Sequence, residues 1–175
     1  MSAQPIALIE AITQALAYEL RNDDAVVVLG EDVGVNGGVF RATAGLHARF
    51  GSERILDTPL DETTIAGLAV GMAFQGMKPV AEAQFDGFIY PMFDHIICHA
   101  ARMRTRTRGR LHCPMVLRAP WGGGIRAPEH HSEANAVTGS NPAAVSSRIN
   151  SFGSAIKSRP FSTRCVSPCE NAAHG

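Results

Sequence analysis

The feature of this sequence that most constrains its fold is the run Ala-Val-Val-Val-Leu at residues 25–29. Consecutive β-branched residues favour a strand, and a strand without a polar position must be covered on both faces. Strands of this kind occur in parallel sheets, where crossover helices cover each face. Gly30, Glu31 and Asp32 follow directly, so the two carboxylates stand at the carboxyl end of the strand, where open α/β sheets place their binding sites.

Segments with helix and strand patterns alternate as far as about residue 120. Apolar residues three or four positions apart predict helices over 6–20 and 88–104, and a small, apolar, glycine-spaced segment predicts another over 63–77. Further strands are predicted at 55–58, 78–83 and 114–118, and the glycine-rich segment 34–45 is predicted to be a flexible loop near the site. This order predicts an α/β fold, a parallel sheet flanked by helices on both faces.

Residues 135–175 have a different composition, rich in Ser, Ala, Asn and Pro, and we predict that they are mostly disordered or poorly packed. The net charge is zero, which does not favour a nucleic-acid or membrane partner. No apolar run reaches the ~20 residues that cross a bilayer. The sequence shows no secretory signal, and its cysteines form no CxxC pair, so we expect free thiols and a cytoplasmic location.

Six stretches in register resemble one family, the beta subunit of the decarboxylating component of 2-oxo acid dehydrogenases. They are Leu-Gly-Glu-Asp-Val from 29, Gly-Gly-Val-Phe from 37, Asp-Thr-Pro-Leu-Asp-Glu from 57, Ala-Glu-Ala-Gln-Phe-Asp-Gly-Phe from 81, Arg-Ala-Pro-Trp-Gly from 118 and His-His-Ser from 130. The resemblance implies a transketolase-like pyrimidine-binding domain over residues 1–134. It stops near Ala134, so that domain is expected to be incomplete and the family's C-terminal domain absent. An out-of-frame ending would explain the junction, and resequencing the locus would test it.

The resemblance also implies a reaction and partners. The reaction is oxidative decarboxylation of a small 2-oxo acid, branched-chain or pyruvate, with thiamine diphosphate as cofactor and acyl transfer to the lipoyl arm of an acyltransferase core. In the family, a Gly-Asp-Gly motif on a separate alpha subunit holds the cofactor's diphosphate through magnesium, and this sequence has no such motif. An alpha partner in a heterotetramer is therefore implied. We expect little or no decarboxylation from this chain, even when it is mixed with a matching alpha subunit.

The resemblance assigns roles to five residues. It places the Glu62 carboxyl group against a ring nitrogen of the cofactor's aminopyrimidine, and Leu60 and Phe88 beside that ring, with Glu31 supporting the same site. It matches His131 with the family histidine that faces the substrate. The residues alone also allow simpler interpretations: Glu62 as an acid interacting with a helix dipole, Phe88 as a core residue and His131 as a surface histidine.

Other patterns leave alternatives open. His95 and His99 have a metal-like spacing, but no third ligand is obvious, so no metal site is expected and an exposed or interfacial helix face is the simpler interpretation. Five arginines alternate from Arg102 to Arg110, where the end of a helix running into a basic loop is favoured over a phosphate-binding strand. Two further functions compete with the catalytic subunit. One is an inactive remnant that only binds a partner, and the other is another thiamine-diphosphate enzyme of the transketolase type.

Overall fold

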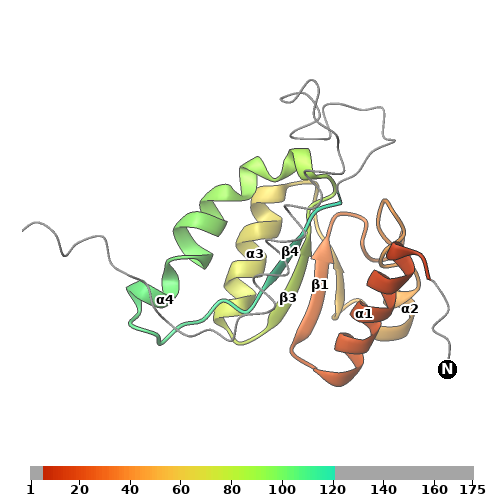
Figure 1. Ribbon diagram of the computed structural model, residues 1–175, viewed down its shortest axis with the longest axis horizontal. Coiled ribbons are helices and arrows are strands. Elements are labelled where there is room, and N and C mark those ends of the chain that lie inside the picture. Colours follow the sequence, from red (N-terminus) through yellow and green to blue (C-terminus); the bar gives the residue numbers. More distant parts are fainter. Residues whose placement is uncertain (1–5, 121–175) are drawn as a thin grey trace, which may run out of the picture. The chain divides into compact units, whose positions relative to one another are not determined.

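A computed structural model describes residues 6–120, which contain one parallel four-stranded sheet (Figure 1). The strands lie in the order β2-β1-β3-β4, and all three neighbouring pairs are parallel. Their bounds are β1 Val26–Gly30, β2 Ile55–Asp57, β3 Lys78–Glu82 and β4 Val116–Arg118. The predicted α/β architecture with a parallel sheet is therefore confirmed.

β1 lies between two other strands, where its wholly apolar run is shielded from water. All five of its residues are buried, as the sequence predicted. Val28 pairs with Ile55 of β2 on one side and with Val80 of β3 on the other. At the end of the strand Gly30 allows a close approach, since a Cβ there would lie 2.7 Å from the carbonyl oxygen of Glu82.

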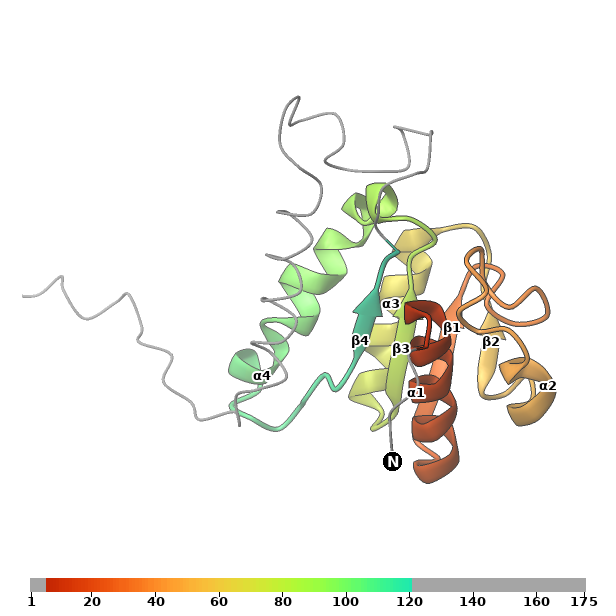
Figure 2. The same cartoon turned by 45° about the vertical axis from the view of Figure 1, so that its right-hand side comes forward.

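Helices cover both faces of the sheet, as the alternation of helix and strand predicted (Figures 1 and 2). Helix α1 (Leu8–Asn22) and the short helix α2 (Leu46–Phe50) lie on one face. Their buried apolar residues pack with alternate residues of β1; this core contains Leu16, Ala17, Leu20, Val26, Val28, Val33, Leu46 and Ile55. The sequence did not predict α2, which lies between Gly45 and Gly51.

Helix α3 (Glu62–Phe74) covers the opposite face together with the helical segment that follows β3. The remaining side chains of β1 pack here; this core contains Val27, Leu29, Ile65, Ala66, Ala69, Ala81, Ala83 and Met92. No helix among residues 6–120 is long and apolar enough to span a membrane.

The single helix predicted over 88–104 is wrong in detail. The chain instead forms the 3-10 turns η1 (Asp86–Phe88) and η2 (Tyr90–Met92), the π-helix η3 (His95–Ala100) and the α-helix α4 (Met103–Arg106). Pro91 lies within η2 and has no backbone N–H, so a regular α-helix cannot be continuous there. In η3 the N–H of Ala101 bonds the carbonyl of Ile96, five residues back, at 2.9 Å.

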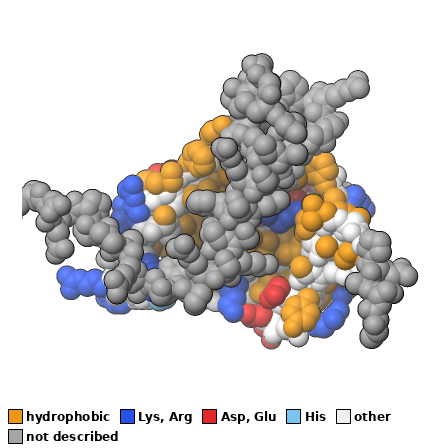
Figure 3. Space-filling model, in the orientation of Figure 1, with side chains coloured by type: hydrophobic (Ala, Val, Ile, Leu, Met, Phe, Trp, Pro, Cys, Tyr) orange, Lys and Arg blue, Asp and Glu red, His pale blue; other side chains and the backbone are white. Residues whose placement is uncertain are grey.

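None of the alternating arginines lies on a strand: Arg102 precedes α4, Arg104 and Arg106 lie in it, and Arg108 and Arg110 lie in the turn that follows. This agrees with the favoured interpretation of the sequence. On the face drawn in Figure 3, Lys and Arg side chains gather at the end of the molecule where α4 lies.

The chain divides into two units, Met1–Val137 and Thr138–Gly175, and all described residues belong to the first. The predicted boundary at residue 134, the composition-based prediction for residues 135–175 and the candidate His131 lie outside the described residues.

Candidate active site

Charged side chains collect where the parallel strands end. Glu31 and Asp32 follow β1, and β2, β3 and β4 end on Asp57, Glu82 and Arg118. Because the carboxyl ends of parallel strands lie at one edge of a sheet, these residues converge on the edge where α/β proteins bind their ligands. The start of α3, with Asp61 and Glu62, follows β2 at this same edge.

Helix α3 begins at Glu62 because Asp61 caps it. Asp61 has an extended backbone (φ −160°, ψ 103°), and its carboxylate accepts a hydrogen bond from the N–H of Thr63 at 3.0 Å. It also accepts from the hydroxyl group of Thr64, and these bonds, Thr64 first, hold the pKa of Asp61 below its usual value. Asp61 is thus the capping residue, and Glu62, an acid in the first turn of α3, can also interact with the helix dipole as the simpler interpretation proposed. Glu62 is half-buried in the first turn of α3.

Glu31 and Glu62 lie close enough for their charges to interact. The pKa of Glu31 is raised, first by burial and then by the nearby carboxylates of Asp32 and Glu62, while a hydrogen bond from the Gln84 side chain opposes the shift. The structure therefore brings together two residues that the sequence analysis assigned to one site, from the ends of β1 and the start of α3. A carboxyl group with a raised pKa beside a second carboxyl group is suited to holding or sharing a proton.

The two apolar residues that the sequence analysis assigned to the site, Leu60 and Phe88, differ in exposure. Leu60 is 75% exposed, which leaves its side chain available to a ligand. Phe88 is half-buried, and its ring meets the ring of Phe85 edge-on, with centroids 5.7 Å apart. Phe85 meets Phe40 in the same manner, also at 5.7 Å. Phe88 thus belongs to a row of three aromatic rings joined by edge-to-face contacts. The last ring of the row, Phe40, lies in the glycine-rich loop 34–45.

The glycine-rich loop 34–45 is fastened to the sheet, which the sequence did not predict. The N–H of Gly34 donates to the Asp57 carboxylate at 2.6 Å. The buried hydroxyl group of Thr43 donates to the carbonyl of Val33 at 2.7 Å. A Cβ on Gly38 would lie 3.5 Å from the Glu82 carboxylate, so the loop also packs over the end of β3.

A buried ion pair supports the same edge of the sheet and was missed by the sequence analysis. Glu82 is 3% exposed, and the guanidinium group of Arg118 donates to its Oε2. Burial raises the pKa of Glu82, and the charge and hydrogen bond of Arg118 act against that rise. Both residues fall within stretches that carried the family resemblance, but nothing in their spacing indicated that they touch.

Comparison with known proteins identifies the family of the domain. Residues 4–137 match the family model described as "Transketolase, pyrimidine binding domain". The chain is 58% identical over 129 residues to the pyruvate dehydrogenase E1 component subunit beta of Acholeplasma laidlawii, covering 74% of this chain and 39% of that protein. It is 53% identical over 127 residues to the protein of the same name from Bacillus subtilis, covering 73% and 39%.

A third relative is named for a different 2-oxo acid. The chain is 51% identical over 131 residues to the 3-methyl-2-oxobutanoate dehydrogenase subunit beta of Mycobacterium tuberculosis, covering 75% of this chain and 38% of that protein. The chain therefore spans about two fifths of the length of the curated relatives it matches. Its relatives are beta subunits of 2-oxo acid dehydrogenases, and the chain itself belongs to the family of the transketolase pyrimidine-binding domain.

Proposed function

We propose that this chain supplies the pyrimidine-binding half of a thiamine-diphosphate site in the decarboxylating component of a 2-oxo acid dehydrogenase. The observation that carries this proposal is the position of Glu62, half-buried at the carboxyl edge of a parallel sheet and electrostatically coupled to Glu31. The names of the relatives support the reaction class. They leave two candidate substrates, pyruvate and 3-methyl-2-oxobutanoate.

The residues at this edge fit an aminopyrimidine ring. The ring has nitrogen atoms that need polar partners and flat faces that need apolar neighbours. Glu62 offers the carboxyl group, and Leu60 offers an exposed apolar side chain. Phe88 contributes an aromatic ring, four residues after Gln84, whose side chain hydrogen-bonds Glu31. When bound, thiamine diphosphate supplies the carbon nucleophile and the electron sink for decarboxylation.

In this proposal the chain's own residues hold the pyrimidine ring in the form that accepts a proton, and they exclude water from it. Glu62 hydrogen-bonds a pyrimidine nitrogen and holds the ring in the tautomer that accepts a proton. Glu31, whose pKa is raised by burial and by the carboxylates of Asp32 and Glu62, supports Glu62 at the same site. Leu60 and Phe88 keep the ring in apolar surroundings, which strengthens the hydrogen bond to Glu62. His131 is proposed to face the 2-oxo acid.

The proposal requires a second polypeptide. Since the sequence contains no Gly-Asp-Gly motif, we propose that an alpha subunit holds the diphosphate through magnesium. The acyl group then passes to a lipoyl acyltransferase, and the assembly is proposed to be cytoplasmic.

The proposal is tested by measuring thiamine diphosphate binding to an alpha subunit of a relative, alone and mixed with this chain. We expect the chain to tighten binding, and Glu62→Gln to weaken it by about 10–100-fold, since a hydrogen bond to a charged group contributes about 1.5–3 kcal/mol. Glu53→Gln, at an exposed position before β2, is the matched control and should behave as the parent chain. The proposal fails if the mixture binds no better than the alpha subunit alone, or if both variants bind equally.

A further inference from the structure

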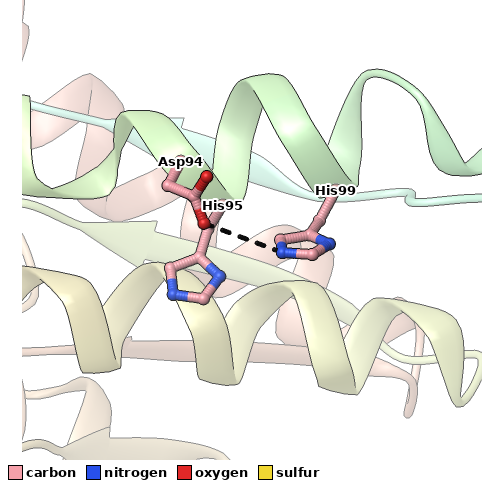
Figure 4. Close-up of side chains that lie close together, drawn as sticks. All are labelled: Asp94, His95 and His99. Carbon is pink, nitrogen blue, oxygen red and sulfur yellow. Dashed lines mark ion pairs between the residues drawn. The ribbon is translucent and has the colours of Figure 1, made fainter.

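Three potential metal ligands meet on the helical segment after β3. Asp94, His95 and His99 each direct one ligand atom to a common region, and these atoms all lie within 4.8 Å of one another (Figure 4). The sequence analysis found the two histidines but no third ligand, and the structure adds Asp94 as a candidate for it. Asp94 was missed because its position directly before His95 matches no common metal-binding motif. The proposed pyrimidine site uses none of the three residues.

The two imidazole rings lie as neighbours on one side of the helix. Their centroids are 5.5 Å apart and their planes differ by 33°. His99 Nε2 is 3.8 Å from the Asp94 carboxylate, and the side chains of these two residues are 40% and 71% exposed. Both histidines lie in the π-helix η3, a form that is rare and often found at functional sites.

The side chain of His95 is held in place by packing against α3. A Cβ on Gly67 of α3 would lie 3.1 Å from both Cε1 and Nε2 of the His95 ring. Glycine at this position therefore makes room for the imidazole, and α3 restricts its rotation. This contact gives a physical reason for one of the glycines of α3, each of which costs about 1 kcal/mol relative to alanine in a helix.

We propose that Asp94, His95 and His99 bind a divalent transition-metal ion such as Zn²⁺. Two imidazole nitrogens and one carboxylate oxygen suit zinc and its neighbours, whereas magnesium and calcium prefer oxygen ligands alone. Zinc–ligand bonds of about 2.0–2.2 Å place tetrahedral ligand atoms about 3.3–3.6 Å apart. The ligand atoms lie up to 4.8 Å apart, so binding requires side-chain rotation of Asp94, which is exposed, and of His99, which is half-buried. A water molecule completes the four ligands.

The test uses the full chain, stripped with a chelator and titrated with Zn²⁺ by calorimetry, with Co²⁺ absorption as a second measurement. Replacing even an outer-shell partner of a metal site costs about 10–100-fold in affinity, so we expect His99→Ala to weaken the tightest site at least tenfold. His99 is substantially exposed, so this variant is expected to fold. His112→Ala, at an exposed position outside the cluster, is the matched control and should leave the affinity unchanged.

Two further measurements separate a metal site from a structural role of the histidines. Zn²⁺ should raise the unfolding temperature of the parent chain and of His112→Ala, but not that of His99→Ala, because only a ligand bound to the folded state stabilises it. Gly67→Ala, which displaces the His95 ring without removing a ligand, should also weaken binding while the far-ultraviolet circular dichroism stays unchanged. Equal affinities of His99→Ala and the parent chain, or a cobalt–thiolate absorption band, would overturn the proposal.

Discussion

Replacing Arg118 with methionine is expected to destabilise the chain strongly, because it leaves a buried carboxylate without its counter-ion. Glu82 is 3% exposed, and Arg118, whose side chain is 18% exposed, donates to its Oε2. Removing one partner of a buried ion pair costs about 3–5 kcal/mol. A domain of this kind has a free energy of unfolding of about 5–15 kcal/mol. The substitution should therefore remove a large part of the stability.

The loss should depend on pH in a defined direction. Burial raises the pKa of Glu82 above the ordinary value of 4.5, and Arg118 acts against that rise, first by its charge and then by its hydrogen bond. Without Arg118 the pKa of Glu82 in the folded chain rises further. As pH increases, the unfolded carboxyl group ionises first, so the penalty is smallest below pH 4.5 and grows as pH passes through the folded pKa.

Urea unfolding followed by far-ultraviolet circular dichroism measures both effects, at about pH 5 and about pH 7.5. A double variant, Glu82→Met with Arg118→Met, replaces both partners by apolar side chains of similar length and should recover most of the lost stability. The reasoning is refuted if Arg118→Met stays within about 1 kcal/mol of the parent chain at the higher pH, since breaking a buried pair costs several times that. It is equally refuted if the double variant is no more stable than the single one.

Two other substitutions test how the loops are fastened. Gly34→Ala should lower the free energy of unfolding by about 1–3 kcal/mol, because its Cβ would lie 2.4 Å from Oδ2 of Asp57. Gly71→Ala is the control: its Cβ has open space around it, so it should stabilise α3 by about 0.5–1 kcal/mol. Equal effects of the two substitutions in urea unfolding would contradict this. Arg54→Ala should cost about 2–4 kcal/mol, since Arg54 donates to the carbonyl groups of residues 20, 23 and 26. Arg49→Ala, at an exposed position, is its control, and a similar loss in both would argue against the role of Arg54.

The strands and the helices α1 and α3 were predictable because their patterns are local. The apolar run of β1 is buried throughout. The apolar stripe predicted for the first helix is buried at Leu16 and Leu20, whereas Ile6 and Ile9 at its start are exposed. The prediction of one regular helix over 88–104 was wrong. The helix widens at η3 because the N–H of Ala101 bonds the carbonyl five residues back, and the spacing of apolar residues does not determine that hydrogen-bond partner. Helix α2 has five residues, too few for a periodic pattern to be visible.

The candidate site was predictable only as far as the family motifs reached. They indicated Glu31 and Glu62, which the structure brings together; the roles of these residues and of Leu60, Phe88 and His131 stay predictions. The ion pair of Glu82 with Arg118 joins residues 36 positions apart, and pairs of that kind depend on strand order. The order β1-β3-β4 makes them neighbours, and no local pattern in the sequence contains that order.

The central strand has a consequence for how the molecule comes apart. Val26 and Val28 of β1 contribute to the packing under α1, while Val27 and Leu29 contribute to the packing under α3. If β1 separates from the helices on one face of the sheet, apolar side chains packed on the other face are exposed as well. Opening of either layer is therefore coupled to opening of both. We expect the amide hydrogens of β1 to exchange with solvent only through complete unfolding, so their exchange rates should report the total stability of the domain and follow every substitution discussed above.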